Sequence, residues 1–338
     1  MKIYLSYKTK THAWGGGNQF IKNLSKELNK KNLICDRPGD ADLILFNSHH
    51  NLIETLKLKL KYPKKKFIHR IDGPISSYRG NEEKWLDDII YLFNKTIADG
   101  TIFLSKWSRD ENKKTGFNSN NKLTVIYNSA NNKVFKEKRF LLPPKDKKIK
   151  LISSSWSTNF LKGFKVFKYL DENLDFNKYE MTFIGNSKIK FKNIKMIPPV
   201  NSEELSNNIY QSHIFIFASK IESCSNLLIE AMSTNIPILL IDGTSNNEIF
   251  NSNGFFFKDE KDVIYQLEKL INQYDDLEVK KKYFFDETTK LYIDFFQQII
   301  NDKIFMEKVS LFKAFSLYTK YLLVKVRNKI KFLKEKYL

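Results

Sequence analysis

Short apolar segments alternate with amphipathic segments along most of this chain. In the first 130 residues the apolar runs fit buried strands, and the segments between them repeat apolar residues at helical spacing. The predicted strands are 2–7, 42–48, 65–72, 100–105 and 122–129. The predicted helices are 15–31, 84–98 and 106–116. Strands separated by helices in this way are typical of a parallel sheet with helices on its faces.

The same alternation starts again after a linker rich in proline and lysine at 141–148. The second series of predicted strands is 150–155, 179–185, 213–219 and 236–241. The second series of predicted helices is 163–174, 202–212, 225–235 and 260–274. The fold class that this pattern predicts is α/β, with two Rossmann-like doubly wound domains, 1–140 and 149–300, and a basic helical extension, 301–338. Because ligands of such sheets bind beyond the carboxyl ends of the strands, we expect the functional site in a cleft between the domains.

The charge of the chain is distributed unevenly. Its formal net charge of +19 resembles that of a nucleic-acid-binding protein, but residues 1–140 carry +13, residues 141–300 carry −1 and residues 301–338 carry +7. A neutral middle flanked by two basic regions fits a protein that touches an anionic surface, such as phospholipid headgroups, or an acidic acceptor with one side.

Cysteine use and hydropathy indicate the compartment. The two cysteines, Cys35 and Cys224, lie in unrelated contexts, which argues against a disulfide framework and favours a reducing compartment. The first residues fit a strand with no apolar signal segment behind them. The apolar runs are far shorter than the roughly 18 residues that a membrane-spanning helix needs. We therefore expect a cytoplasmic protein, with peripheral contact to the inner face of the cell membrane as a further hypothesis.

Two glutamates, Glu222 and Glu230, lie eight positions apart around the start of a predicted helix. Ser225 and its neighbours can cap this helix, and the first backbone N–H groups, near Asn226 and Leu227, form with the helix dipole a site for a diphosphate. Glu222 would lie beside the phosphates, and Glu230 would accept hydrogen bonds from a neighbouring pair of hydroxyls. On these residues alone, two solvated surface glutamates remain an open alternative.

Several segments, in order along the chain, resemble one known family. The segment 222–239, "ESCSNLLIEAMSTNIPIL", resembles the E-x7-E signature of family 4 of the retaining glycosyltransferases, which are two-domain enzymes of the GT-B fold. "GGGNQF" resembles the glycine loop of that family, and "ADGTIFLSKWSRD" and "VIYNSANNKVF", with Asn128, resemble two of its conserved segments. "LKGF" resembles its Lys-Gly pair, "TFIG" the strand that ends at Gly185, and "IDGTSNNEIF" the loop that leads to Glu248. The resemblance covers residues 1 to about 300.

The resemblance implies a role for each matching residue. In such enzymes the second domain holds a nucleotide-diphosphate sugar, which is a substrate, so that no cofactor is expected. The lysine that matches Lys162 neutralises the phosphates, the glutamate that matches Glu222 contacts the transferred sugar, and Glu230 would bind the ribose hydroxyls. The glycine loop at 15–17 would let the backbone approach the ligand. The residues expected to bind the donor are Glu230, Ser225, Asn226, Leu227, Gly16, Gly17, Ser154 and Gly185.

This chain departs from the family pattern at two places in the second domain. The family usually has an arginine a few residues before the Lys-Gly pair, whereas here Ser154, Ser155 or Trp156 occupies that neighbourhood. One phosphate contact is therefore weaker or comes from elsewhere. Asn235 stands where a glycine is usual before the proline, and we expect it to adopt the left-handed C-cap conformation.

The first domain offers acceptor-side candidates in the segment "FIHRIDGP". It resembles an Arg-x-Asp-Gly version of the family pattern, which makes Asp72 and His69 candidates for the catalytic region. Asp72 would orient the acceptor, and Arg70 would meet phosphate or an acidic acceptor. His49 and His50, after another predicted strand, are further candidates for acceptor contacts. For each histidine a structural role in the core is an equally open interpretation.

Other readings of these motifs are weaker. Asp40 and Asp42 have the spacing of the metal-binding motif of the other large glycosyltransferase fold, but they precede a strand and so lie at the wrong edge of the sheet. We therefore predict no metal site. The glycine loop lacks the G-x-G-x-x-G spacing of an NAD-dependent enzyme. A nucleic-acid binder without catalysis is disfavoured because no aromatic stacking motif is interleaved with the basic residues.

The residues after 300 lie beyond the resemblance. They mix phenylalanine, leucine, tyrosine and valine with lysines, and no uncharged run in 305–338 exceeds six residues. One interpretation is a basic amphipathic helix that lies in a membrane interface. The other is a helix that packs on the first domain or pairs with another subunit.

Together these features predict a retaining, metal-independent glycosyltransferase. It would move a sugar, as a hexosyltransferase, from a nucleotide donor to a hydroxyl of a glycan or lipid-linked acceptor in cell-surface polysaccharide synthesis. A phosphorylase-like or epimerase activity in the same cleft remains an alternative.

Overall fold

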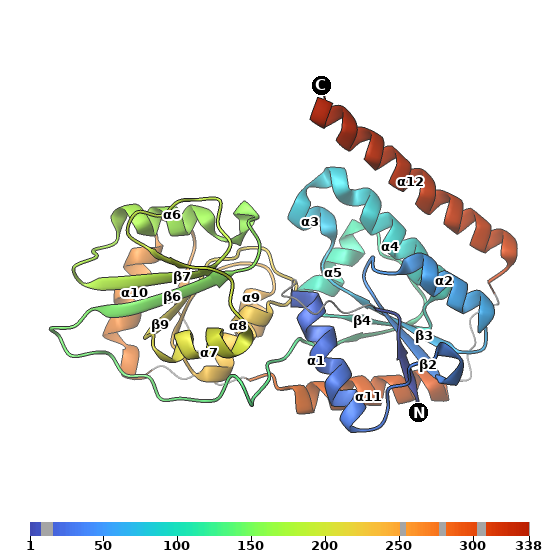
Figure 1. Cartoon of the computed structure of the whole chain (residues 1–338), viewed down its shortest axis with the longest axis horizontal. Helices are drawn as coiled ribbons and strands as arrows, with labels where there is room; N and C mark the ends of the chain where they lie inside the picture. Colours follow the sequence, from blue (N-terminus) through green and yellow to red (C-terminus); the bar gives the residue numbers. More distant parts are fainter. Residues whose placement is uncertain (8–15, 251–254, 277–281, 303–308, 338) are drawn as a thin grey trace.

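The protein, described here by a computed structural model, consists of two α/β domains that lie side by side (Figure 1). The structure describes residues 1–7, 16–250, 255–276, 282–302 and 309–337. Each domain is built on one sheet whose paired strands all run parallel.

The N-terminal sheet has five strands in the order β1-β2-β3-β4-β5. These are β1 (Ile3–Leu5), β2 (Leu43–Asn47), β3 (Lys66–Ile71), β4 (Gly100–Phe103) and β5 (Lys122–Val125). A further parallel bridge joins Ile3 to Ile34 at the other edge of β1. The segment at Ile34 therefore lies on one side of β1, and β2, which follows it in the sequence, lies on the other side. This reversal of direction makes the sheet doubly wound.

Helices cover both faces of the N-terminal sheet. One face carries α1 (Gly16–Lys30) and α11 (Phe285–Asn301), and the other carries α2 (Leu52–Lys61), α4 (Lys84–Ile97) and α12 (Leu311–Tyr337). Two shorter helices, α3 (Ile75–Arg79) and α5 (Lys106–Thr115), follow β3 and β4, and 3-10 turns occupy Pro38–Asp40 and Asn81–Glu83. Figure 1 shows α11 beneath the sheet and α12 above it.

The C-terminal sheet has six strands in the order β11-β10-β9-β6-β7-β8. They are β6 (Ile149–Ser155), β7 (Tyr179–Gly185), β8 (Lys195–Ile197), β9 (Ile214–Phe217), β10 (Ile238–Ile241) and β11 (Phe255–Phe257). Because β6 lies between β7 and β9, the strand order reverses there. One face packs on α6 (Phe164–Asn173) and α10 (Val263–Asn272), and the other packs on α7 (Ser202–Tyr210), α8 (Asn226–Thr234) and α9 (Asn246–Ile249). Two 3-10 turns lie at Phe160–Lys162 and Tyr274–Asp276.

The predicted α/β class with two doubly wound sheets is confirmed, and so are two predicted helix ends. Gly116 follows α5 with a φ of 119°, and Asn235 follows α8 with a φ of 67°, so that both adopt the left-handed conformation. The three-residue edge strands β8 and β11 were not predicted. The pattern also predicts no element at α2, where "LKLKLK" alternates with a period of two although the segment is helical.

The chain crosses back to the first domain after the second sheet. The sequence pattern places residues 285–300 in the C-terminal domain, but α11 packs on the N-terminal sheet, where Tyr292 and Phe296 join Ile3 and Phe20 in one core. The apolar stripe of α11 shows that the helix is covered on one side, but it does not show which sheet covers it. Among the described residues, no helix is both long and apolar enough to cross a membrane.

Candidate active site

A cavity of about 600 Å³ lies between the two domains, at the carboxyl ends of strands from both sheets. Most of the candidate residues from the sequence line it. They are Glu222, Lys162, Asp72, Glu230, Ser225, Asn226, Leu227, Gly16, Gly17, Ser154 and Arg70. His69, His49, His50 and Gly185 are outside its lining. The strand order of both sheets reverses beside this cavity, as the doubly wound fold leads one to expect.

An ion pair between Lys162 and Glu222 lies in the wall from the C-terminal domain. Lys162 Nζ is 2.6 Å from Glu222 Oε1, and their side chains are 26% and 13% exposed, so both remain accessible from the cavity. The backbone N–H of Glu222 donates to Thr244 Oγ1, which fixes the loop after β9. A positive and a negative group are thus held together at the position where the sequence predicted the phosphates and the transferred sugar.

A glycine sets the position of Lys162. Gly163 directly follows the 3-10 turn that carries the lysine, and it has a φ of 90°. A Cβ atom at this position would collide with Ala218 at the end of β9. Only glycine combines this backbone conformation with such close contact to the neighbouring strand, so the Lys-Gly pair has a steric cause.

The N-termini of two helices meet at the cavity. Ser225 is the N-cap of α8, and its hydroxyl accepts from Leu228 N–H at 3.3 Å. Asn226 Nδ2 donates to the carbonyl oxygen of Gly16 in the first turn of α1 at 2.8 Å, and Asn226 Oδ1 is buried without a partner among the described residues. Two positive helix ends therefore face one space, which favours an anion there. Gly15, the first residue of the predicted glycine loop, lies outside the described residues.

Glu230 lies one turn into α8 and faces the cavity. Among the described residues, no side chain donates a hydrogen bond to its carboxylate. Burial raises the pKa of this carboxyl group from 4.5 to about 8. A carboxyl group in this position has capacity for hydroxyl donors.

The end of β6 forms another part of the wall. Ser154 lines the cavity together with Ser153, Ser155 and Trp156, where the family has an arginine. Gly185, at the end of β7, lies behind this wall: it has a φ of 130°, and a Cβ atom there would collide with the carbonyl oxygen of Ser155. Gly185 therefore shapes the loop after β6 and does not line the cavity, contrary to its predicted place among the donor-binding residues.

Arg70 is the centre of a buried network that joins the N-terminal domain to the cavity floor. Its side chain is 0% exposed and its guanidinium lies over the ring of Phe20 at 4.5 Å. Four hydrogen bonds hold it, to Asn47 Oδ1 (2.7 Å), Asn128 Oδ1 (2.7 Å), Asp72 Oδ1 (3.2 Å) and Tyr292 Oη (3.2 Å). Most of its donors are used, so it positions other groups, whereas we expected it to meet phosphate or acceptor. Asp72, with a side chain 36% exposed, is the member of this network most open to the cavity.

Asn128 connects this hydrogen-bond network to the second domain. Its Nδ2 donates to the carbonyl oxygen of Cys224 at 2.9 Å, and its backbone N–H donates to Cys224 Sγ at 3.2 Å. Arg70, Asn128 and the loop before α8 are therefore linked across the domain boundary.

His69 is a core residue, which corrects its predicted place in the catalytic region. Its side chain is 0% exposed, and its ring stacks on Phe46 with the centroids 4.0 Å apart. Nε2 lies 2.9 Å from the carbonyl oxygen of Ser48, and Nδ1 lies 3.2 Å from Asn94 Nδ2. Burial lowers the pKa of the imidazole from 6.5 to about 3. The prediction was wrong because His69 lies inside β3, a central strand whose faces are both covered. The pattern "FIHRID" does not show whether a residue lies within the strand or at its end.

His49 and His50 lie in the turn after β2, outside the lining of the cavity. Their rings pack against each other with centroids 4.2 Å apart, and Tyr7 contacts the ring of His50 edge-on. Burial and the neighbouring His50 lower the pKa of His49 from 6.5 to about 4. Ser48 and Asn51, on either side of the pair, have φ values of 47° and 54°, and such left-handed residues in a loop cost conformational energy.

Glu248 connects the domains in a way that the sequence did not reveal. Its carboxylate accepts from the backbone N–H groups of Lys106 (2.6 Å) and Trp107 (2.9 Å), the first residues of α5, and from Tyr127 Oη (2.5 Å). A carboxylate of one domain thus caps a helix of the other. Because its partners are about 120 residues or more away along the chain, no local pattern could have indicated this contact.

Among the described residues, no group of three His, Cys, Asp or Glu side chains is arranged to hold a metal ion. Asp42 precedes β2 and accepts from the backbone N–H of Lys2 at 2.7 Å. Asp40 ends a 3-10 turn and pairs with Arg37. Both aspartates lie at the amino edge of the sheet, as the sequence order predicted.

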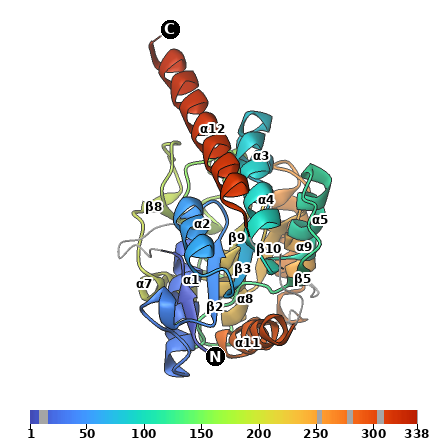
Figure 2. The ribbon, with the colours of Figure 1, turned by 90° about the vertical axis from the view of Figure 1, so that its right-hand side faces the viewer.

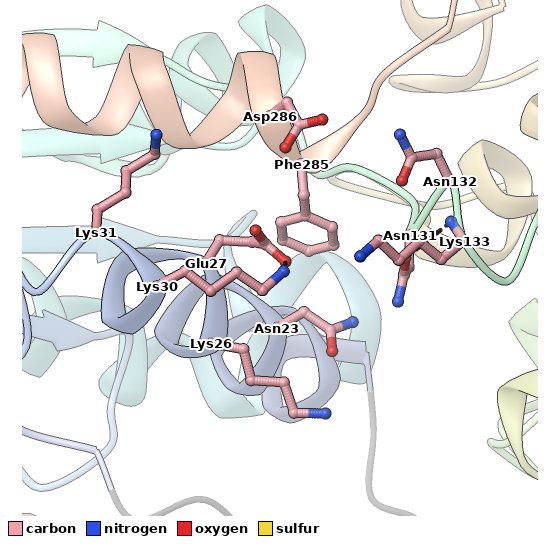
Figure 3. Close-up of a pocket in the computed structure, with 10 residues that line it drawn as sticks. All are labelled: Asn23, Lys26, Glu27, Lys30, Lys31, Asn131, Asn132, Lys133, Phe285 and Asp286. Carbon is pink, nitrogen blue, oxygen red and sulfur yellow. Dashed lines mark hydrogen bonds and ion pairs between the residues drawn. The ribbon is translucent and has the colours of Figure 1, made fainter.

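A second cavity, of about 500 Å³, adjoins the first behind α1 (Figure 3). Its lining consists of Asn23, Lys26, Glu27, Lys30, Lys31, Asn131, Asn132, Lys133, Phe285 and Asp286. Asn23, Lys26 and Asn131 belong to both cavities. Figure 3 shows Glu27 and Asp286 among the lysines, and Glu27 pairs with Lys30, so part of the positive charge is neutralised within the cavity.

Comparisons with known proteins match this architecture. Residues 135–284, which include most of the C-terminal domain, match the model of the family of glycosyl transferases group 1. HepE of Anabaena, solved in complex with UDP-glucose, superposes with a TM-score of 0.68 at 10% identity, over 88% of this chain and 99% of that chain. The chain has the GT-B fold. A comparison with curated protein sequences gave no match.

Other enzymes of the GT-B fold superpose less closely. Sucrose-phosphate synthase of Thermosynechococcus elongatus has a TM-score of 0.62 at 11% identity, over 86% of this chain and 82% of that chain. The catalytic domain of starch synthase IV from Arabidopsis thaliana, solved with ADP and acarbose, has a TM-score of 0.60 at 12% identity, over 86% and 79%. The family match supports a glycosyltransferase, and these likenesses support the GT-B fold.

Proposed function

We propose that this protein is a retaining glycosyltransferase of family 4 type, which moves a hexose from a nucleotide-diphosphate sugar to a hydroxyl of a glycan or lipid-linked acceptor. One observation carries the proposal. The Lys162–Glu222 ion pair, the N-terminus of α8 and the unpartnered carboxyl group of Glu230 lie in one cavity between two GT-B domains. Together these groups offer partners for the sugar, the diphosphate and the ribose of one nucleotide-diphosphate sugar.

The donor would lie along the C-terminal wall. Its diphosphate would take the place between Lys162 and the N-terminus of α8, where both the ammonium group and the helix dipole favour negative charge. Its sugar would extend to Glu222, and its ribose hydroxyls would donate to Glu230. HepE binds UDP-glucose and starch synthase IV binds ADP, which makes a nucleoside diphosphate the ligand class to test first.

The chemistry requires stabilisation of a departing nucleoside diphosphate. As the bond between the anomeric carbon and the phosphate oxygen breaks, negative charge grows on the β-phosphate, where Lys162 and the helix N-termini can stabilise it without a metal ion. The acceptor oxygen would bond to the anomeric carbon on the same face. Its proton would pass to the departing phosphate oxygen, so that the configuration is retained.

The acceptor would enter from the N-terminal wall. Asp72 is the most exposed member of the Arg70 network and would accept a hydrogen bond from a second, non-reacting hydroxyl of the acceptor, while Arg70 keeps Asp72 in place. The basic first domain and the basic extension suit an acidic or lipid-linked acceptor. Such an acceptor suits an enzyme that takes part in cell-surface polysaccharide synthesis at the cytoplasmic side of the membrane.

A panel of ligands tests the proposal. We expect at least one of the UDP-, GDP- and ADP-sugars to raise the melting temperature, and the best binder to be hydrolysed slowly in the absence of an acceptor. The released sugar, followed by NMR, should keep its anomeric configuration.

The same panel separates the alternatives. Salt-dependent binding of a random oligonucleotide, with no thermal shift from any nucleotide sugar, would mean a nucleic-acid binder. A shift with NAD alone would mean a dehydrogenase. A phosphorylase-like or epimerase activity would release a sugar phosphate or an altered sugar nucleotide.

A further inference from the structure

The outer face of α12 exposes large apolar side chains. Figure 2 shows this helix rising beyond the body of the N-terminal domain. Its inner face is covered: Ala314, Leu317, Tyr321 and Val324 pack with α2 and α4, and the ring of Tyr321 meets Phe93 edge-on. The helix is therefore attached to the domain along one side, and its other side points outward.

Large apolar side chains gather on that outer side. Phe312 is 83% exposed, and Leu323 and Phe315 are 69% and 67% exposed. The complete group, called the α12 stripe below, is Leu311, Phe312, Phe315, Tyr318, Leu322, Leu323, Val326 and Ile330. At about 100° per residue these positions share the face opposite Leu317 and Val324. Contiguous exposed apolar surface of this kind marks an interaction site.

Basic side chains border the α12 stripe on both sides. Lys313, Lys320 and Arg327 are seven positions apart and follow one edge, while Lys325 lies on the other edge and Lys329 lies within the stripe, on the same side of the helix as Leu311. All five are exposed, and residues 311–330 contain no acidic residue. The apolar surface is thus enclosed by positive charge alone.

This charge pattern decides between two occupants. If two copies of the chain paired through the α12 stripe, the lysines of both would meet along the seam with no carboxylate from residues 311–330 to compensate them. An anionic lipid surface offers both an apolar layer for the stripe and negative headgroups for its borders. We propose that the α12 stripe docks onto the surface of an anionic phospholipid bilayer.

The helix would lie in the plane of the interface. Its 27 residues extend for about 40 Å, and its attached inner face keeps the domain on the water side. The domain that carries α12 also supplies Asp72 to the cavity, so docking would bring the acceptor-side wall to the membrane. This surface adds a partner to the proposed function but does not rest on it, because lipid binding requires neither donor nor turnover.

Vesicle sedimentation of the full-length chain tests this proposal. We expect binding to vesicles of phosphatidylglycerol and phosphatidylcholine in equal parts, weak binding to pure phosphatidylcholine, and release by salt. The triple variant Phe312→Ser, Phe315→Ser, Leu323→Ser should lower the partition coefficient by about tenfold or more. A matched control, Leu141→Ser, Tyr265→Ser, Leu291→Ser, alters three apolar residues elsewhere that are 57%, 59% and 51% exposed, and it should bind as the wild type does.

Further variants keep the result independent of helix loss. Phe312→Leu with Phe315→Leu preserves both apolarity and helix propensity and should restore binding. Replacement of Lys313, Lys320 and Arg327 by glutamine should weaken binding to the mixed vesicles, whereas glutamine at Lys113, Lys114 and Lys168 should not. The proposal is overturned if the wild type ignores anionic vesicles, if it binds neutral vesicles equally well, or if the stripe variant binds unchanged. It is also overturned if the stripe variant turns a dimer into a monomer and leaves lipid binding intact.

Discussion

The two walls of the cavity use their charged residues in opposite ways. In the C-terminal wall Lys162 and Glu222 pair with each other, and among the described residues Glu230 has no donor. In the N-terminal wall Arg70 is wholly buried, and four hydrogen bonds hold it. A charged group whose partners are few and exposed is available to a ligand, whereas one whose bonds are all internal maintains the fold.

The difference follows from where each residue lies on its element. Glu222 is in the loop beyond the end of β9, and Lys162 is in the turn that follows β6, so both side chains project past the sheet into the cavity. Arg70 belongs to β3, which pairs with β2 and β4 and is covered by helices on both faces. A residue inside a central strand becomes buried, whatever its charge.

The first prediction, with the largest expected effect, tests the ion pair of the C-terminal wall. Lys162→Ala and Glu222→Ala should abolish turnover, with kcat lower by about a hundredfold to a thousandfold, because the leaving diphosphate and the sugar each lose the group that holds them. The fold should survive, since both side chains are partly exposed. Steady-state kinetics with the best donor of the panel, together with circular dichroism, measure both effects.

Lys165 supplies the matched control for Lys162. It lies three positions further on, its side chain is 70% exposed, and it pairs with Glu260 away from the cavity. Lys165→Ala should therefore retain wild-type kinetics. Wild-type rates in Lys162→Ala or Glu222→Ala would mean that the C-terminal wall does not act on the donor.

The second prediction concerns the opposite wall and has a structural readout. Arg70→Met should destabilise the protein by about 3–5 kcal/mol, because it leaves Asp72 and the buried Asn47 and Asn128 oxygens without their donor. Urea denaturation measures this loss. Arg109→Met should change stability by about 0.5 kcal/mol or less, since Arg109 pairs with Asp110 at the surface. An Arg70 variant of unchanged stability but without activity would make Arg70 a ligand contact after all.

The C-terminal wall was predictable because local rules place its residues. Ser225 before an apolar helix gives a helix start, and a helix start gives an anion site. Gly163 has a steric reason to follow Lys162. The alternation of strands and helices was likewise sufficient for the α/β class, while three-residue strands such as Phe255–Phe257 carry too few positions for a periodic signal.

The N-terminal wall could not be predicted in the same way because tertiary contacts determine it. Nothing in "FIHRID" shows that His69 stacks on Phe46, or that Arg70 donates a hydrogen bond to the hydroxyl oxygen of Tyr292, over 200 residues later. The return of α11 to the first sheet creates that contact. Long-range packing thus separated the exposed Asp72 from its buried neighbours, although the three candidates lie within four positions.

The last prediction, with the smallest expected effect, concerns Glu230 in the C-terminal wall and the pH dependence of donor binding. The carboxyl group of Glu230 has a pKa of about 8 in the folded protein and 4.5 when unfolded, so the folded state retains a proton between these values. The raised pKa therefore adds to the free energy of unfolding below pH 4.5, and this contribution is lost as the pH rises through 8. The comparison that reveals it is with Glu230→Gln, which has no titrating group at this position. Ribose hydroxyls donate to the ionised carboxylate, so donor binding must release this proton. Between about pH 6 and pH 8 the affinity for a nucleotide sugar, measured by calorimetry, should rise by about fiftyfold in the wild type and stay flat in Glu230→Gln. The same slope in both proteins would show that the ribose does not contact Glu230.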